Sequence, residues 1–364
     1  MNITVRERTA AQRLTIVDCD IHPAFRTPAE LHPFLPERWR EHVKTFGEHV
    51  RHGLTGQLPY PRMMAAGMRV DSFPEQGPPG SDLDLMRRQH LDMNGVEVGM
   101  LMPLSRAGME ERNLDFAGAL ARAVNDWQLE RWVGEEPRLR AGIVVPQEDA
   151  VFSVEEIERR ADDARFVQIL MSPRSSDPLG HRRYWPIYAA AERARRPIGL
   201  HVQGYSGGHA STGSGWPTYY MQEHYAMVGN MQAVMTSLIF EGVFARFPNL
   251  KIVLIEGGFA WVPALSWRMD KHWERMRKET PHVTRPPSEY VREHFYFTTQ
   301  PIEEPENPRD LAAIMELIGY DRLMFSTDYP HWDFDDPHRA FKTQLTEEQR
   351  AQVFRDNAKA LYAL

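Results

Sequence analysis

The chain has 364 residues, of which 42% are hydrophobic and 10% aromatic, a composition typical of globular rather than disordered proteins. Its formal net charge is -7 and it has no strongly basic run, so nucleic acid is not expected as a partner. With one cysteine, Cys19, it cannot form an intramolecular disulfide, which fits a reducing compartment. The polar start at 1–13 is unlike a signal peptide, and no apolar run reaches the roughly 20 residues of a membrane span. We therefore expect a cytoplasmic protein that does not bind membranes.

Short apolar runs alternate with helical patterns along the chain. Most runs are continuous rather than alternating, as in parallel strands buried on both faces. The expected strands are 14–22, 96–103, 139–146, 165–172, 197–204, 251–258, 294–301 and 322–330. The expected helices include 114–133, 153–164, 184–196, 231–247 and 306–319, and a last helix ends the chain. Eight strand–helix units favour a closed (β/α)8 TIM barrel over an open doubly wound sheet, and the lack of a clean linker predicts one domain over 1–364.

Two segments are longer than a bare barrel needs. Residues 23–81 form an insertion after the first strand, rich in Pro, Gly, His and Arg, which could be a lid, a subunit contact or a surface loop. Residues 204–220 follow the fifth strand and are rich in Gly and Ser before a group of aromatic residues. Loops after barrel strands lie on the catalytic face, so this loop could act as a mobile lid, with an ordinary surface loop as the alternative.

Acidic and histidine residues stand at the ends of three expected strands. Asp20 and His22 point to the same face of the first strand, because strand side chains alternate with period two. His201 ends the fifth strand and Asp328 ends the eighth. Each residue alone is as consistent with a satisfied polar group or a helix cap. Together they predict one metal site, suited to a divalent ion such as Zn²⁺ or Mn²⁺ that activates water and polarises a substrate oxygen.

Several further residues are candidates for contacts with substrate. His331 lies in the same loop as Asp328 and could hydrogen-bond to it, contact substrate or lie on the surface. The guanidinium of Arg174, after the fourth strand, suits a substrate carboxylate as well as a surface position. An aromatic pocket, with local packing as the alternative, could be formed by Trp216, Tyr219, Tyr220 and Trp332.

Other titratable residues are expected to play no part in chemistry. Asp18 lies a full pleat deeper than the metal-ligand pair and is expected to be structural. Cys19 points to the opposite face and is expected to be a small buried residue. Three histidines on helical or connecting segments, namely His90, His272 and His294, are expected on the surface.

Four segments carry a resemblance to a known family. They are VDCDIHP at the start, residues 243–270, RLMFSTDYPHWD at 322–333 and FRDNAKALY at 354–362. Together they resemble the amidohydrolase-related (amidohydrolase 2) family of metal-dependent TIM barrels, which contains hydrolases and decarboxylases. The resemblance covers nearly the whole chain from residue 14, except the insertion at 23–81. It implies that His201 is a metal ligand, that Asp328 binds the metal or acts as general acid or base, and that the protein is a homodimer.

Two positions depart from the family pattern. The first-strand pair, usually His-x-His or Glu-x-His, is here Asp20-x-His22, which keeps the site suitable for a metal. After the sixth strand, where well-studied decarboxylases of the family have His-Gly, this chain has Glu256 followed by two glycines. Glu256 could replace that histidine as general base, hold another ligand, or be a buried helix-capping acid; we favour an active-site role.

We therefore expect a metal-dependent hydrolase in which water, activated by one divalent ion and deprotonated by Asp328 or Glu256, attacks the carbonyl of a small, cyclic or aromatic substrate. Zinc is the favoured ion and manganese the alternative. The second hypothesis is a non-oxidative decarboxylase of an aromatic or unsaturated carboxylic acid. The missing histidine before the glycines counts against it. The third is a barrel without metal that serves as a binding or scaffold protein.

Overall fold

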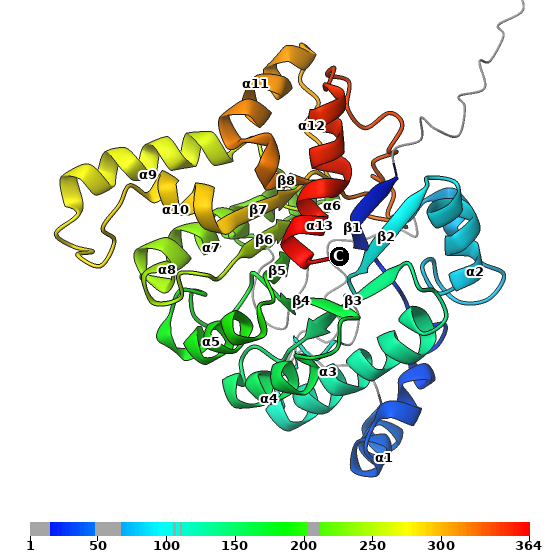
Figure 1. Ribbon diagram of the computed structural model, residues 1–364. Helices are drawn as coiled ribbons and strands as arrows, with labels where there is room; N and C mark the ends of the chain where they lie inside the picture. The colour runs from blue at the N-terminus through cyan, green and yellow to red at the C-terminus, as the bar shows by residue number, and fades with distance from the viewer. Residues whose placement is uncertain (1–14, 48–66, 105–106, 110, 203–211) are drawn as a thin grey trace, which may run out of the picture.

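The computed structural model describes residues 15–47, 67–104, 107–109, 111–202 and 212–364. At its centre lies a parallel sheet whose eight strands are neighbours in chain order (Figure 1). The strands are β1 (Ile16–Ile21), β2 (Val96–Leu101), β3 (Leu139–Val144), β4 (Phe166–Met171), β5 (Ile198–His201), β6 (Ile252–Ile255), β7 (Phe295–Thr298) and β8 (Leu323–Met324). Nearly all strand residues are buried, which explains the continuous apolar runs. The predicted TIM barrel is confirmed.

The first and last strands close the barrel through a short seam. β8 has only two strand residues, so the predicted strand at 322–330 was too long. Beyond β8, three backbone hydrogen bonds continue the seam. The amide of Cys19 donates to the carbonyl of Phe325 (3.0 Å), that of Asp328 to the carbonyl of Asp20 (3.2 Å), and that of His22 to the carbonyl of Tyr329 (2.8 Å). The regular ladder ends early because other backbone amides of this segment bond to side chains. Thr327 N, for example, donates to Oδ1 of Asp18 at 2.9 Å.

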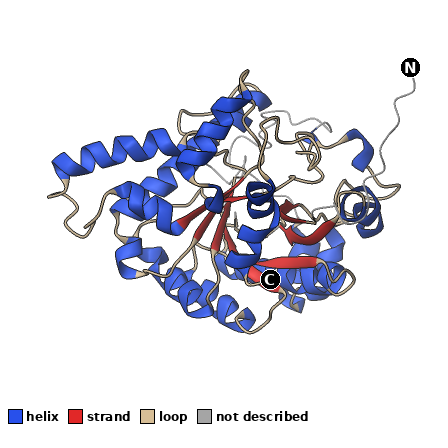
Figure 2. Cartoon of the chain, turned by 45° about the horizontal axis from the view of Figure 1, so that its top comes forward, coloured by secondary structure: helices blue, strands red, loops and turns tan. Residues whose placement is uncertain are grey.

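Helices surround the barrel (Figure 2). They are α1 (Glu37–Phe46), α2 (Leu83–Met86), α3 (Leu114–Gln128), α4 (Ala150–Arg160), α5 (Trp185–Ala194), α6 (Tyr220–Ala226), α7 (Val228–Phe240), α8 (Val243–Arg246), α9 (Val262–Met276), α10 (Pro287–His294), α11 (Pro308–Ile318), α12 (Glu347–Ala351) and α13 (Asn357–Tyr362). The helix expected at 231–247 is divided into α7 and α8, because Gly242 between them has a left-handed backbone (φ 78°). None of the described helices has both the length and the apolarity that crossing a bilayer requires.

Polar residues just before several helices fix where those helices begin. Asn113 accepts a hydrogen bond from the amide of Phe116 at the start of α3. Asp149 and Asn307 accept from amides in the first turns of α4 and α11. Such caps satisfy amides that have no partner inside a helix. They therefore determine the residues at which these helices begin.

The described part of the insertion touches the loop after β8. It includes the helix α1, and its end forms an antiparallel bridge between Met68 and His331. Residues 48–66 of the insertion and 203–211 of the expected lid lie outside the described residues. At the C-terminus, the stack of Phe354 on Phe325 (ring centroids 4.4 Å apart) packs the last helical segment against the end of β8.

Candidate metal centre

Five buried acidic and histidine side chains converge at the C-terminal mouth of the barrel. One ligand atom from each lies within 4.8 Å of the others. They are Asp20 and His22 at the end of β1, His201 at the end of β5, Glu256 after β6 and Asp328 after β8. The structure therefore brings together the four ligands expected from the sequence, and Glu256 joins them.

Both histidines direct Nε2 toward this centre, because backbone carbonyl groups hold their other ring nitrogens. Nδ1 of His22 donates to the carbonyl of Met102 at 2.9 Å. Nδ1 of His201 donates to the carbonyl of Val202 at 2.5 Å. A hydrogen on Nδ1 leaves a lone pair on Nε2 of the neutral ring. Carbonyl partners of this kind orient histidines that bind metals.

The two Nε2 atoms face carboxylate oxygens. His22 Nε2 lies 3.2 Å from Oδ1 of Asp20 and 2.7 Å from Oδ1 of Asp328. His201 Nε2 lies 3.3 Å from Oδ2 of Asp20 and 3.1 Å from Oε2 of Glu256. Among the described residues, His201 Nε2 and both carboxylate oxygens of Asp20 make no hydrogen bond. Buried lone pairs that face one another are unfavourable unless a positive charge, either a proton or a metal ion, lies between them. Two imidazoles and three carboxylates thus fit a single divalent ion.

Burial and charge set the protonation of these groups. Burial lowers the pKa of His22 to about 4, which keeps this ring neutral near pH 7. Burial also raises the pKa of the Asp20 and Asp328 carboxyls above their ordinary value. At His201, burial favours the neutral ring, but the Asp20 and Glu256 carboxylates outweigh it and raise the pKa well above its usual range. The carboxylates therefore attract positive charge strongly.

Two of the five residues hold an unusual backbone conformation. Glu256 has a φ of 56° and Asp328 a φ of 63°, both in the left-handed region. Residues other than glycine rarely adopt this conformation, and where they do the surrounding structure must hold them. At both positions the turn directs a carboxylate into the mouth just beyond a strand. Strain at such positions is common in functional sites.

Two neighbours of Asp328 determine its surroundings. His331 Nδ1 lies 2.6 Å from Asp328 Oδ1, and its ring centroid is 4.4 Å from that of His22. Although burial opposes it, the charge of Asp328 raises the pKa of His331 to about 9. On the other side, the amide of the fully buried Gln300 donates to Asp328 Oδ2 at 3.3 Å. Gln300 was not among the residues expected at the site, although its place just after β7 gave a positional signal.

A second polar group adjoins the first through Glu256. Nε2 of His224, on α6, lies 2.9 Å from Oδ2 of Asp333, and ligand atoms of these two residues and Glu256 lie within 4.8 Å of one another. Trp332 borders this group, since its indole donates to the hydroxyl of Tyr220 at 3.3 Å and its ring centroid lies 6.0 Å from that of His224. His224 and Asp333 were not singled out in the sequence, because neither follows an apolar run directly.

The other expected substrate contacts lie farther from the five side chains. Trp216 is 46% exposed and Tyr219 is 71% exposed. Within the described residues, no hydrogen bond or ring contact joins either of them to the metal-ligand candidates. Their role in binding substrate stays a prediction.

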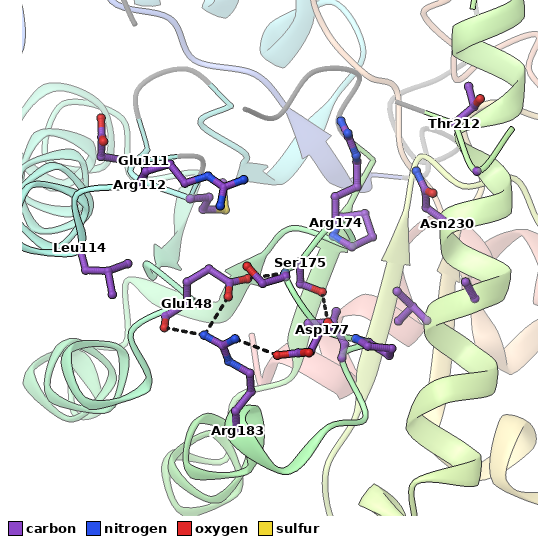
Figure 3. Close-up of a pocket in the computed structure, with 18 residues that line it drawn as sticks. Glu111, Arg112, Leu114, Glu148, Arg174, Ser175, Asp177, Arg183, Thr212 and Asn230 are labelled. Carbon is purple, nitrogen blue, oxygen red and sulfur yellow. Dashed lines mark hydrogen bonds and ion pairs between the residues drawn. The ribbon is translucent and has the colours of Figure 1, made fainter. Parts of the chain in front are cut away.

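Arg174 lines a cavity of about 540 Å³ bordered by the segments that follow β2, β3, β4 and β5. The cavity is lined by Met109, Glu111, Arg112, Leu114, Glu148, Pro173–Leu179, Arg183, Thr212, Gly213, Asn230, Ala233 and Val234. In Figure 3, Arg183 is joined to Glu148 and Asp177, and Arg174 extends away from this network. The cavity is large enough for a small aromatic molecule.

Two of the three histidines expected on the surface are buried. His90 is fully buried, because the π-helical segment Arg87–Asp92 turns it toward Asp18, whose Oδ2 lies 2.6 Å from Nε2. His294 is buried at the end of α10, where Nδ1 bonds to a backbone carbonyl and the ring stacks on Phe244. The expectation was wrong for both, because a backbone or carboxylate acceptor satisfies each ring in the interior. His272 is exposed, and Cys19 is buried, as predicted.

The chain is similar to known proteins along most of its length. The family model described as amidohydrolase matches residues 17–364. Gamma-resorcylate decarboxylase of Polaromonas sp. (strain JS666) is 29% identical over 318 residues, which cover 83% of this chain and 94% of that protein.

Solved structures share the fold. The dihydroxybenzoic acid decarboxylase of Polaromonas sp. JS666, with bound manganese and 2-nitroresorcinol, has a TM-score of 0.66 at 22% identity and covers 96% of this chain and 97% of its own. The 5-carboxyvanillate decarboxylase of Novosphingobium aromaticivorans, also with bound manganese, has a TM-score of 0.72 at 17% identity. That match covers 98% of this chain and 99% of the other. At these identities the likeness establishes the fold.

Proposed function

Because the chain belongs to the amidohydrolase family, we propose that it is a metal-dependent, non-oxidative decarboxylase of an aromatic carboxylic acid. The observation that carries this proposal is the convergence of three buried carboxylates with two imidazole Nε2 atoms that face them. The relatives make decarboxylation the preferred reaction, since the first four of them are gamma-resorcylate decarboxylases. Hydrolysis, which the sequence analysis favoured, uses the same ligands and becomes the alternative.

Asp20, His22, His201, Glu256 and Asp328 would hold the ion. When bound there, a divalent ion supplies positive charge that draws in the carboxylate and an adjacent oxygen of an aromatic acid. Manganese is the proposed ion, because three of the five donors are carboxylates and two related structures carry manganese. Zinc, the ion favoured from the sequence, stays the alternative. Metal analysis of the purified protein distinguishes the two ions.

The side chains around Asp328 supply the proton that decarboxylation needs. Burial raises the pKa of Asp328, which favours its protonated form. The carboxyl would give its proton to the ring carbon that bears the substrate carboxylate. The bond between that carbon and the carboxylate then breaks, its electron pair returns to the ring, and carbon dioxide leaves. His331, with a pKa near 9 and 2.6 Å from Asp328, can restore the proton after each turnover.

The remaining residues would shape the pocket. Trp332, beside His224 and Tyr220, would contact the aromatic ring of the substrate. Arg174 on the adjacent cavity would bind an additional acidic substituent. Trp216 and Tyr219, which are exposed, would contact only a larger substrate. The binding or scaffold hypothesis becomes the last alternative, because it gives no function to five buried ligand groups that converge on one point.

The test is turnover of two substrate panels by the same manganese-loaded protein. One panel contains hydroxybenzoic acids and related aromatic acids, assayed for released carbon dioxide. The other contains esters, amides and lactones, assayed for hydrolysis. The proposal predicts release of carbon dioxide from at least one acid, loss of that activity after chelation, and its return with Mn²⁺. Hydrolysis of the second panel without any release of carbon dioxide would refute it.

A further inference from the structure

We infer that a buried pair of residues below the metal centre, Asp18 and His90, positions the metal ligands Asp20 and Asp328 on the two strands of the barrel seam. The inference rests on the metal centre of the proposed function, although not on the reaction catalysed there. Both side chains are fully buried, and His90 Nε2 lies 2.6 Å from Asp18 Oδ2. Neither takes part in the proposed chemistry, so their burial needs another explanation.

The carboxylate of Asp18 accepts four hydrogen bonds. Its Oδ1 accepts from the backbone amides of Asp20 at 3.2 Å and Thr327 at 2.9 Å. Its Oδ2 accepts from the hydroxyl of Thr327 at 2.6 Å and from Nε2 of His90 at 2.6 Å. A buried carboxylate with four donors is fully satisfied and fixes the position of each donor.

Three of these donors, the amide of Asp20 and the amide and hydroxyl of Thr327, belong to the two segments that carry the ligands. Asp20 is itself a ligand candidate, and Thr327 directly precedes Asp328. The amide of Tyr329, which directly follows Asp328, donates to the hydroxyl of Thr327 at 3.3 Å. The network therefore holds the residues on both sides of Asp328, whose left-handed backbone (φ 63°) depends on its surroundings.

The seam needs this support because its regular ladder is short. β8 contributes two strand residues and pairs with β7, and the only bridge between the segment after β8 and β1 within the described residues joins Tyr329 to Ile21. Where another barrel would have ladder hydrogen bonds, the amide of Thr327 turns to a side chain of β1. The distance between Asp20 and Asp328 thus depends on Asp18 as well as on strand pairing.

The role of His90 is to orient Asp18 from the outer side. The side-chain amide of Asn94 donates a hydrogen bond to Nδ1 of His90 at 3.0 Å. The hydrogen of the imidazole is therefore on Nε2, which donates to Asp18. The ring of His90 lies parallel to that of Tyr329, with centroids 5.0 Å apart and planes 5° apart. The imidazole therefore has one orientation, and Asp18 has one position.

The experiment measures Mn²⁺ binding without substrate, by titration of chelator-treated protein. His90→Leu should weaken binding by about 10-fold to 100-fold, the usual effect of removing a partner that orients metal ligands. His90→Gln keeps a donor near the position of Nε2 and should restore binding to within about threefold of wild type. Thr327→Val and Thr327→Ser form a second pair with the same contrast, in case the histidine variants fold poorly.

His294→Leu is the matched control. This histidine is equally buried and stacks on Phe244, with centroids 4.2 Å apart, but it precedes β7 at the opposite end of the barrel from the ligands. It should lower the melting temperature and leave the affinity for Mn²⁺ unchanged. If His90→Leu and Thr327→Val lower the melting temperature without weakening Mn²⁺ binding, the pair is merely structural and the inference is overturned. Wild-type protein that binds Mn²⁺ but releases no carbon dioxide refutes the proposed function alone, and wild-type protein that binds no Mn²⁺ overturns both.

Discussion

Nε2 of His22 lies 2.7 Å from Oδ1 of Asp328, although 306 residues separate them in the chain. Closure of the barrel brings them together, because β1 and β8 are the two strands that meet at the seam. With Nδ1 of His22 bound to a carbonyl, both atoms of this contact present lone pairs. The contact therefore marks the point where the first and last strands of the barrel would share one cation.

Loss of the charge on Glu256 should weaken metal binding. Glu256→Gln keeps the size of the side chain but replaces a carboxylate that faces His201 Nε2 at 3.1 Å. We expect the affinity for Mn²⁺ to fall by about 10-fold to 100-fold, measured by titration of metal-free protein. The control is Glu303→Gln, because Glu303 accepts from the amides of Phe259 and Ala260 and lies outside the ligand set. Equal affinities of the two variants for Mn²⁺ would show that Glu256 does not bind the metal ion.

Asp328→Asn should separate proton transfer from folding. Asparagine tolerates the left-handed backbone at this position, so the loop should keep its shape. The amide cannot deliver a proton to carbon, and we expect kcat for release of carbon dioxide to fall by about 10²-fold to 10⁴-fold. The melting temperature should change little. A variant with wild-type kcat would show that another group supplies the proton.

Gly80→Ala should disturb the first-strand ligand through the backbone. Gly80 has a φ of 80°, and an added Cβ would lie 2.4 Å from the carbonyl oxygen of His22. The control is Gly95→Ala, because Gly95 also has a positive φ (64°) but open space at Cβ. We expect Gly80→Ala to lower the free energy of unfolding by about 1–3 kcal/mol more than the control does, measured by urea denaturation. Equal losses of unfolding free energy in the two variants would show that the backbone around Gly80 accommodates the added Cβ without moving His22.

Asp335 should make stability depend on pH. Burial raises the pKa of this carboxyl from 3.8 to about 7, although its oxygen accepts from the amide of Ile302 at 3.1 Å. Between these values the folded state binds more protons than the unfolded state, so its contribution to stability falls as the pH rises from about 4 to about 7. Asp335→Asn should remove this fall and raise the free energy of unfolding at pH 8 by about 1–3 kcal/mol. Parallel stability curves for the two proteins between pH 4 and 8 would contradict this account.

The barrel and the five convergent side chains could be predicted, four of them as metal ligands and Glu256 in an active-site role, because each signal was local. Asp20, His22 and His201 lie within apolar runs whose buried faces and ends are readable from the sequence. Asp328 was placed at a strand end, and it reaches the site even though β8 stops four residues earlier. The single domain over 1–364 and the homodimer stay predictions.

The remaining features depend on contacts between distant segments. His90 was expected on the surface because it falls on a helical or connecting segment, and only the fold reveals its partner Asp18 on β1. Gln300 and Asp333 reach the mouth from loops and His224 from α6, and a strand pattern does not give the direction of these segments. The choice between hydrolysis and decarboxylation also lies outside such patterns, because both reactions use the same ligands.

The most direct test of the proposed activity follows a labelled carboxyl group. Manganese-loaded protein is incubated with hydroxybenzoic acids labelled with ¹³C in the carboxyl carbon, and the products are measured by mass spectrometry. We predict that the label leaves as carbon dioxide in equal amount to the decarboxylated phenol, and that chelator-treated protein releases none. Label that stays entirely in the aromatic acid, while the same protein hydrolyses an ester or amide, would contradict the account.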